Sequence, residues 1–281
     1  MKILFIGGGN MAQAILGGLI ANGMNSADAM VVEPYPATQE KLTALGFASR
    51  SQFDEIATAH AAIADVIVLA VKPQMMADAI APLKGRLCAQ LVLSIAAGVR
   101  LADLQRALGG HDLIVRTMPN TPALILRGIT GLYAGAAVDS AQRARAEALM
   151  QSVGKTVWFS EESMLDAVTA VSGSGPAYVF YFIEALEAAA RDLGMTADAA
   201  RLFAIETFTG AAALAAQSAD SPAVLRANVT SKRGTTERAI EHFDQDALKQ
   251  KFVAGVKAAA ARSSELGDEL AQSLQGTGHA R

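Results

Sequence analysis

A glycine turn between a short strand and a helix is the feature that most constrains this chain. Residues 1–6 form an apolar run long enough for one buried strand, and residues 11–19 repeat apolar side chains at helical spacing. Between them lies Gly7-x-Gly9-x-x-Ala12, a spacing typical of dinucleotide-binding turns. Gly7 permits the tight turn, Gly9 lets a pyrophosphate approach the backbone, and Ala12 lets the helix pack close to the strand. The N-terminal stretch therefore predicts a bound dinucleotide.

Further contacts to the cofactor are expected at the start of this helix and at the end of the second strand. Asn10, Met11 and Ala12 would offer backbone N–H groups and a positive dipole end to the phosphates. The strand at 30–32 ends in Glu33, about 20 residues after the glycines, where an acidic residue normally bonds the adenosine ribose hydroxyls. The alternative for Glu33 is an exposed charge at the end of a strand.

Two later strands also end in residues suited to flank a cofactor. The apolar run 64–71 is followed by Lys72-Pro73-Gln74, and the run 114–118 is followed by a proline-rich polar segment. Ligands of a doubly wound sheet gather at the carboxyl ends of its strands. The residues predicted to contact the dinucleotide here are Ala70, Lys72, Pro73 and Asn120.

The pattern of elements changes near residue 160. Strands and helices alternate over residues 1–160, which predicts an α/β domain of the Rossmann type with a doubly wound, mainly parallel sheet. Residues 161–281 show no convincing strand and predict an all-α domain. Its run 172–176, SGSGP, lacks the strand that precedes a phosphate loop, so we expect a helix break or a close helix contact there. Helices are expected over 164–171, 176–193, 197–217, 222–228, 237–243 and 246–266.

Composition and charge narrow the class of protein. The net charge of −3 predicts no nucleic-acid partner. No apolar run looks long enough to span a membrane, and the N-terminus lacks the basic region of a signal peptide. Cys88 is the only cysteine, which fits a reducing cytoplasm, and its apolar neighbours predict a buried thiol. The four histidines show no ligand spacing, so no metal site is expected.

Several motifs together resemble the pyrroline-5-carboxylate reductase family. The stretch 221–244 reads SPAVLRANVTSKRGTTERAIEHFD, which is similar to that family's signature. Residues 7–12, 71–74, 116–122 and 172–178 are similar to its other motifs, in the same order. The resemblance implies an N-terminal Rossmann domain, a C-terminal helical dimerisation domain, and the reduction of 1-pyrroline-5-carboxylate to L-proline by NAD(P)H, the last step of proline biosynthesis.

The resemblance also implies roles for the polar loop before the helix at 237–243. Ser231, Gly234 and Thr235 would hold the substrate carboxylate, and Thr236 would hydrogen-bond the imine nitrogen as hydride arrives from C4 of the nicotinamide. The alternative is that Thr236 only caps the helix. Family members usually carry glycine where this chain has Arg233, which leaves the conformation of the loop and the substrate range open.

The choice of cofactor and the assembly are further expectations. Glu33 suits the free ribose hydroxyls of NADH, whereas the family commonly uses NADPH, whose 2′-phosphate Arg50 or Lys72 could reach. We therefore expect both NAD(H) and NADP(H) to serve. The alanine-rich, apolar helical half exceeds what a lone small bundle can bury, so a homodimer or a higher homo-oligomer of dimers is expected.

Two other functions compete with this interpretation. A β-hydroxyacid dehydrogenase pairs similar domains but needs a lysine within a helix as acid and base, and the helical patterns at 164–193 and 197–217 contain none. A non-catalytic redox sensor would bind the dinucleotide and a partner, and its polar loop at 230–236 would hold no small molecule. An assay of NAD(P)H loss with pyrroline carboxylate separates all three.

Overall fold

The computed structural model describes residues 1–276 and divides the chain into two compact units. Unit 1 contains Met1–Ser174 together with the chain from Ala259 onward, and unit 2 contains Gly175–Ala258. These compact units do not follow the division into 1–160 and 161–281 that the sequence predicts, and the functional division stays a prediction. The glycines of Gly276-Thr277-Gly278 predict a frayed tail. Of these three residues only Gly276 lies within the described residues, as the last residue of a helix.

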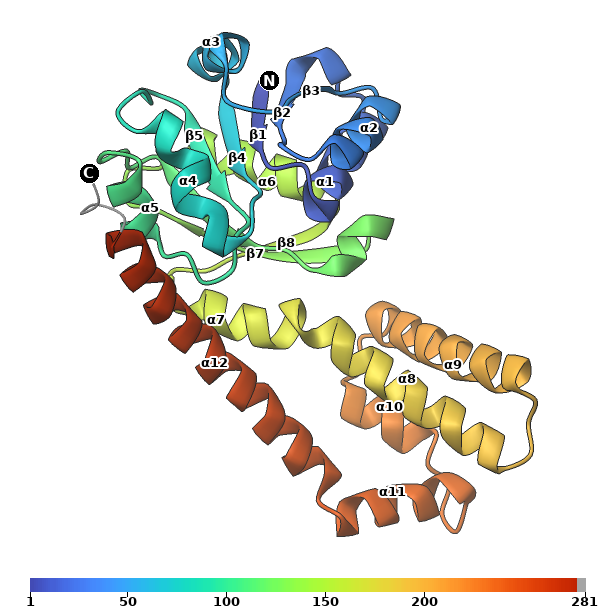
Figure 1. The fold of residues 1–281 in the computed structure, drawn as a ribbon. Helices are drawn as coiled ribbons and strands as arrows, with labels where there is room; N and C mark the ends of the chain where they lie inside the picture. The colour runs from blue at the N-terminus through green and yellow to red at the C-terminus, as the bar shows by residue number, and fades with distance from the viewer. Residues whose placement is uncertain (277–281) are drawn as a thin grey trace. The chain divides into compact units, whose positions relative to one another are not determined.

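Unit 1 is built on one eight-stranded sheet (Figure 1). The strand order is β3-β2-β1-β4-β5-β6-β7-β8, and all neighbours are parallel except β6 and β7. This confirms the doubly wound, mainly parallel sheet that the sequence predicts. The strands are β1 (Ile3–Ile6), β2 (Ala29–Val32), β3 (Ala48–Arg50), β4 (Val66–Leu69), β5 (Leu91–Ser94), β6 (Ile114–Met118), β7 (Gly128–Ala134) and β8 (Gly154–Trp158).

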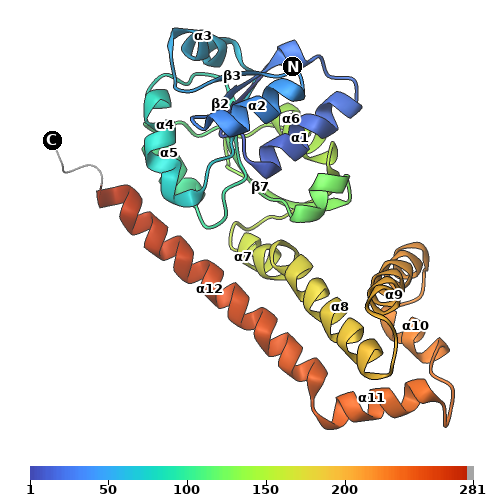
Figure 2. The same ribbon diagram turned by 45° about the vertical axis from the view of Figure 1, so that its right-hand side comes forward.

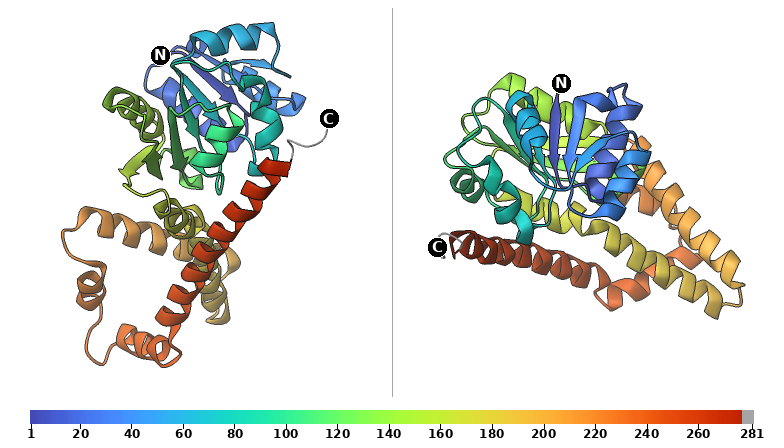
Figure 3. Two further views of the ribbon diagram at one scale, coloured as in Figure 1. Left: turned by 90° about the vertical axis from the view of Figure 1, so that its left-hand side faces the viewer. Right: turned by 45° about the horizontal axis from the view of Figure 1, so that its top comes forward.

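Helices cover both faces of this sheet (Figures 2 and 3). Side chains alternate across the sheet, so Ile3 and Phe5 lie in one hydrophobic core and Leu4 and Ile6 in the other. The first core includes residues of α1 (Asn10–Ala21), α2 (Pro36–Ala44) and α6 (Ser140–Gln151). The second includes residues of α3 (Glu55–Ile63), α4 (Met76–Ile80) and α5 (Leu101–Ala107). Burial of both faces explains why β1, β4 and β5 read as continuous apolar runs.

The serine–glycine run does not end a helix outright. Helix α7 (Met164–Val168) continues into a π-helix at Thr169–Gly173, and α8 begins at Gly175. In the π-turn the backbone N–H of Ser174 donates to the Thr169 carbonyl at 2.8 Å. The predicted close contact is present, because a Cβ placed on Gly173 would lie 2.5 Å from Met118 Cε.

Unit 2 consists of helices, and α8 and α9 pack against each other. They are α8 (Gly175–Asp192), α9 (Ala197–Gln217), α10 (Pro222–Asn228), α11 (Thr235–Gln245) and the first part of α12 (Leu248–Gly276). The side chains of Thr196 and Ser221 cap α9 and α10, as their positions in the sequence predict. Within 175–258, all of which the structure describes, only Ala190, Ala200 and Ala204 are buried.

Helix α12, dark red in Figure 3, is longer than the predicted 246–266, and its C-terminal part belongs to unit 1. Ser263 Oγ donates to Asp166 Oδ1 at 2.7 Å, and Arg100 Nη1 lies 2.7 Å from Asp268 Oδ1. Gly267 permits close approach to the sheet unit, since a Cβ there would lie 3.2 Å from the Gly98 carbonyl oxygen. The loop after β5 is thus held by the C-terminal part of α12.

Two sequence predictions about surfaces are wrong. Cys88 is exposed, although its neighbour Leu87 packs against the second core. Its backbone N–H donates to Gln90 Oε1 at 2.7 Å. One described helix, α9, is long and apolar enough to cross a membrane, judged by length and composition alone. Of its most apolar stretch, 11% is buried within the structure. The many alanines of α9 raise the mean hydropathy of this helix.

Candidate active site

The glycine turn ties together the carboxyl ends of three strands. Gly7 has a φ of +98°, and a Cβ on it would lie 2.7 Å from the Ala70 carbonyl oxygen just beyond β4. Its backbone N–H donates to the Val32 carbonyl at the end of β2, at 2.8 Å. No side chain other than hydrogen therefore fits at position 7.

The turn leaves the start of α1 open to a ligand. Gly9 is the N-cap residue, no side chain caps the helix, and its first turn contains no acidic residue. A Cβ placed on Gly9 would have no heavy atom within 4 Å. The backbone N–H groups of Asn10, Met11 and Ala12 belong to this uncapped first turn. Space and unpaired donors at a helix N-terminus fit a pyrophosphate.

Glu33 is buried, so the interpretation of it as an exposed charge is wrong. Only 5% of the residue is exposed. Its Oε2 accepts from the Gly8 backbone N–H at 2.8 Å, and its Oε1 accepts from the Tyr35 backbone N–H at 2.9 Å. The carboxylate therefore holds the glycine turn in place. Each oxygen keeps a second lone pair with which it can accept from a ribose hydroxyl.

Two cavities lie along the carboxyl edge of the sheet. The first edge cavity measures about 320 Å³ and is lined on the β2 side by Val32, Pro34 and Phe53. The second edge cavity measures about 460 Å³ and is lined on the β5 side by Ala97 and Gly98 and by residues of α12. Gln74 lines both. Together they provide room along this edge, where the two halves of a dinucleotide are expected.

The loop predicted to bind substrate lies at the start of α11 in unit 2. The Gly234 backbone N–H donates to the Ser231 carbonyl at 2.9 Å, and a Cβ on Gly234 would lie 2.9 Å from that oxygen. The helix begins at Thr235, so Thr236 is its second residue and not its cap. The hydroxyl of Thr236 forms no hydrogen bond with any described residue. The interpretation of Thr236 as a plain cap is therefore wrong, because Gly234 occupies the cap position.

Comparison with known proteins identifies the family. The family model described as "Pyrroline-5-carboxylate reductase dimerisation" matches residues 162–266, and "NADP oxidoreductase coenzyme F420-dependent" matches residues 2–98. The chain is 42% identical over 277 residues to pyrroline-5-carboxylate reductase of Pseudomonas aeruginosa, covering 96% of this chain and 98% of that one. The chain belongs to the pyrroline-5-carboxylate reductase family. The resemblance seen in the sequence motifs is thereby confirmed.

Solved structures of the family share the fold. The reductase of Coxiella burnetii matches with a TM-score of 0.87 at 40% identity, covering 94% of this chain and 98% of that one. The Plasmodium falciparum enzyme, crystallised with NADP bound, matches with a TM-score of 0.82 at 27% identity, covering 95% of this chain and 98% of that one. The Rossmann-type sheet and the helical dimerisation region are therefore both shared with solved structures of the family. Membership also argues against the hydroxyacid dehydrogenase and the sensor.

The backbone at position 233 has a conformation that suits glycine better than arginine. Arg233 has a φ of +62°, in the left-handed region that glycine adopts without steric cost. Its backbone N–H donates to Glu237 Oε2 at 2.5 Å. This chain therefore keeps the turn with an exposed, charged side chain where a glycine would fit better.

Lys72 and Asn120, both predicted to contact the cofactor, differ in their exposure and in their hydrogen bonds. Lys72 is exposed and forms no ion pair with any described residue. Asn120 is 9% exposed, and its Oδ1 accepts from the Ile129 backbone N–H at 3.0 Å, which anchors the start of β7. Asn120 thus has a structural role, and the cofactor role predicted for it remains a prediction.

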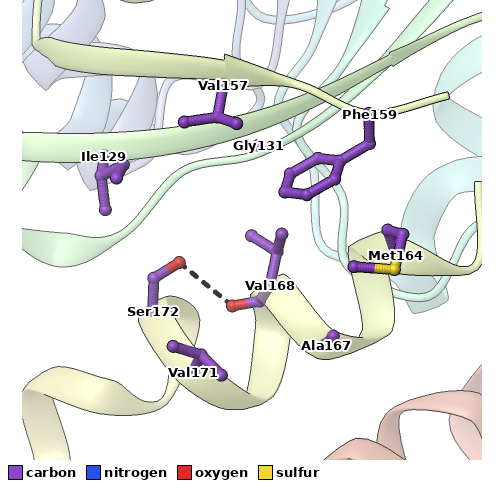
Figure 4. A pocket seen from close by; sticks show the side chains of 9 residues that line it. All are labelled: Ile129, Gly131, Val157, Phe159, Met164, Ala167, Val168, Val171 and Ser172. Carbon is purple, nitrogen blue, oxygen red and sulfur yellow. Dashed lines mark hydrogen bonds between the residues drawn. The ribbon is translucent and has the colours of Figure 1, made fainter.

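A third cavity, of about 260 Å³, lies between β7, β8 and the α7 region (Figure 4). Its lining is almost entirely apolar, and the hydroxyl of Ser172 donates to the Val168 carbonyl at 3.0 Å. Such a cavity offers nothing to a carboxylate substrate. The sequence did not indicate it, because its residues come from elements that are distant in the chain.

Proposed function

We propose that this chain reduces 1-pyrroline-5-carboxylate to L-proline with NADH or NADPH, as the last step of proline biosynthesis. The observation that carries this proposal is family membership over 96% of the chain, in a protein that retains the uncapped glycine turn. In functional terms we divide the chain into a cofactor domain, 1–160, and a substrate and dimerisation domain, 161–281. The match of the dimerisation model to residues 162–266 supports that division.

The cofactor would be held by residues of unit 1. The first-turn N–H groups of α1 bind its pyrophosphate, and Gly9 leaves the space for it. Ala70, Lys72 and Pro73 flank it at the end of β4, and Asn120 does so at the end of β6. When bound, the cofactor supplies a hydride from C4 of its nicotinamide. The remaining work of the protein is to bind and orient the imine and to supply a proton donor.

The substrate would be held by the loop that opens α11. The carboxylate accepts hydrogen bonds from Ser231 and from the backbone N–H groups of Gly234 and Thr235, at the positive end of the helix dipole. Thr236, whose hydroxyl is free of partners among the described residues, donates to the imine nitrogen. A hydrogen bond to this nitrogen increases the electrophilicity of the imine carbon. Thr236 is therefore the proposed catalytic residue.

Both nicotinamide cofactors would be accepted. The Glu33 carboxylate favours NADH, because the 2′-phosphate of NADPH would meet its negative charge. Arg50 at the end of β3 offers a compensating cation, since its buried Nε has no hydrogen-bond partner among the described residues. That Nε lies 3.8 Å from Asp54 Oδ2, so the guanidinium is only loosely paired. Because the Glu33 carboxylate favours NADH and the Arg50 guanidinium favours NADPH, we expect the protein to use both cofactors.

The helical region gives this chain a homo-oligomeric assembly, and we propose that its unit is a homodimer, alone or within a larger oligomer of dimers. Three buried alanines cannot stabilise the 84 residues of 175–258. Phe180, Tyr181 and Phe203 are each at least 60% exposed. The Tyr178 hydroxyl is buried and unpaired among the described residues. A second copy would cover the apolar surface and supply the missing partner. Light scattering that showed an active monomer would refute the dimer.

The same reasoning bears on α9 and on the compartment. We propose that the apolar surface of α9 is covered by a second copy and not by a bilayer, because it lies within the matched dimerisation region. The single, exposed cysteine fits a reducing cytoplasm, where a free thiol persists. Recovery of the protein in the membrane fraction after cell lysis would contradict both statements.

The test of the reaction is a spectrophotometric assay of the purified, folded oligomer. NADH or NADPH should be consumed when 1-pyrroline-5-carboxylate is added, and L-proline should accumulate in equal amount. The matched control is the protein with either cofactor and L-proline alone, which should show no loss of reduced cofactor. Absence of turnover with both cofactors would contradict the proposed function.

A further inference from the structure

The second edge cavity brings two of the family motifs next to helix α12. It is lined by Pro73 and Gln74 after β4, by Ala97 and Gly98 after β5, by the π-helix region, and by α12. All of these residues belong to unit 1, so its geometry is independent of unit 2. Its volume of about 460 Å³ is large enough for one half of a dinucleotide.

The charged groups of α12 on this wall are already engaged. Arg262 Nη1 lies 2.7 Å from Glu269 Oε1 and 3.1 Å from Glu265 Oε2. These hydrogen bonds, that to Glu269 first, raise the pKa of Arg262 above its ordinary value, so the guanidinium is charged and paired. The hydroxyl of Ser263 donates to Asp166. Arg262, Glu269 and Ser263 therefore each have a hydrogen-bond partner within unit 1.

Two neutral polar side chains on the wall remain. The hydroxyl of Thr169 donates to the Leu165 carbonyl at 2.8 Å, which leaves Gln74 and Ser174. The side chains of Gln74 and Ser174 form no hydrogen bond with any described residue. An amide offers both donors and an acceptor, and a hydroxyl offers one donor and two acceptor sites. Both suit a ligand that carries hydroxyl and carboxamide groups.

The π-helix accounts for the position of Ser174. A π-turn is rare and often marks a functional site. Here the i→i−5 bond from Ser174 to Thr169 adds a residue to the turn, and Gly173 packs closely against the Met118 side chain. The turn is therefore held against β6, and Ser174 lies at a fixed point on the cavity wall.

The two edge cavities differ in the half of the cofactor that they would receive. Glu33 directly follows β2, so the adenosine ribose would lie on the β2 side, next to the first edge cavity. The second edge cavity lies beyond β4, next to the end of β5, and so would take the other half. Gln74 lines both cavities and therefore lies between the halves.

We propose that Gln74 and Ser174 hydrogen-bond the nicotinamide riboside half of the cofactor within the second edge cavity. This inference rests on the proposed function, because it takes a nicotinamide dinucleotide as the ligand. The role of the π-helix would then be to present the hydroxyl of Ser174 to the cofactor. Ser172, on the same turn, bonds the Val168 carbonyl and lines the apolar cavity of Figure 4 instead.

The test compares two ligands on three variants of the full oligomer. Binding of NADH and of ADP is measured by titration calorimetry on the wild type, Gln74→Ala, Ser174→Ala and the matched control Ser172→Ala. ADP carries the adenosine and pyrophosphate but lacks the nicotinamide riboside. If the wild type binds NADPH more tightly, NADPH and 2′-phospho-ADP replace this pair.

We expect Gln74→Ala and Ser174→Ala each to weaken NADH binding by about three- to tenfold, since each removes one hydrogen bond. ADP binding should stay within about twofold of the wild type, and Ser172→Ala should change neither ligand. Unchanged NADH binding in Ser174→Ala, or an equal loss for ADP, would overturn the inference. A wild type that binds NADH but does not turn over pyrroline carboxylate would contradict the proposed function and leave the inference standing.

Discussion

Removal of the Glu162 carboxylate should destabilise unit 1 more than a surface substitution does. Arg116 lies within β6 and is 7% exposed. Its Nη1 lies 2.5 Å from Glu162 Oε1, and the same oxygen accepts from the Leu101 backbone N–H at 2.6 Å, at the start of α5. One carboxylate thus neutralises a buried cation and joins β6 to α5.

The size of the effect follows from the burial of the cation that is left behind. Breaking a fully buried ion pair by removing one partner costs about 3–5 kcal/mol, because the other charge stays desolvated. The Glu162 side chain is 28% exposed, so water screens part of the interaction. We therefore expect Glu162→Ala to lower the free energy of unfolding by about 2–4 kcal/mol. Glu162→Gln keeps an acceptor oxygen and should lose about 1–2 kcal/mol.

Urea unfolding followed by the fluorescence of Trp158, the only tryptophan, measures this directly in unit 1. The matched control is Glu161→Ala, an exposed neighbouring carboxylate whose removal should change the free energy of unfolding by less than about 0.5 kcal/mol. Arg116→Met combined with Glu162→Ala should recover most of the loss, since no buried charge remains. If Glu162→Ala behaves like Glu161→Ala, the argument from the buried cation is wrong.

Three further substitutions test the site. Thr236→Ala should lower kcat/KM by about 10- to 100-fold, mainly in kcat, while Thr236→Ser retains most activity; a destabilised but fully active Thr236→Ala protein would contradict the proton-donor role. Glu33→Gln should raise the ratio of kcat/KM for NADPH to that for NADH by about tenfold, and an unchanged ratio would mean that Glu33 only positions the glycine turn. Arg233→Gly should raise the melting temperature by about 1–3 °C at fixed protein concentration, because the left-handed conformation no longer carries a side chain; a melting temperature no higher than that of Arg233→Ala would refute the strain.

The parts of the fold that local sequence determines were predictable. The glycine turn requires a residue without Cβ at Gly7, so a steric requirement of the structure appears directly in the sequence. Strands β4 and β5 are largely apolar because both of their faces are buried, and their ends indicated the edge at which the cofactor is expected. Thr196 and Ser221 marked helix starts because capping is a local interaction.

Features that depend on contacts between distant residues were not predictable. Strand β3 is three residues long and lacks an apolar run, so only its pairing with β2 defines it. Burial of Glu33 depends on the Gly8 backbone, 25 residues away. The end of α12 joins unit 1 through Arg100 and Asp166, which no local pattern reveals. The start of α11 at Thr235 was missed because Gly234 caps it without a side chain.

The most direct test of the central claim follows the hydride itself. Cofactor deuterated at both C4 positions of its nicotinamide is mixed with 1-pyrroline-5-carboxylate and the wild-type oligomer, and the L-proline formed is analysed by mass spectrometry. The account predicts one deuterium per proline, located on the carbon that was the imine carbon. Proline without deuterium, or loss of cofactor without proline, would contradict hydride transfer from the nicotinamide to the imine.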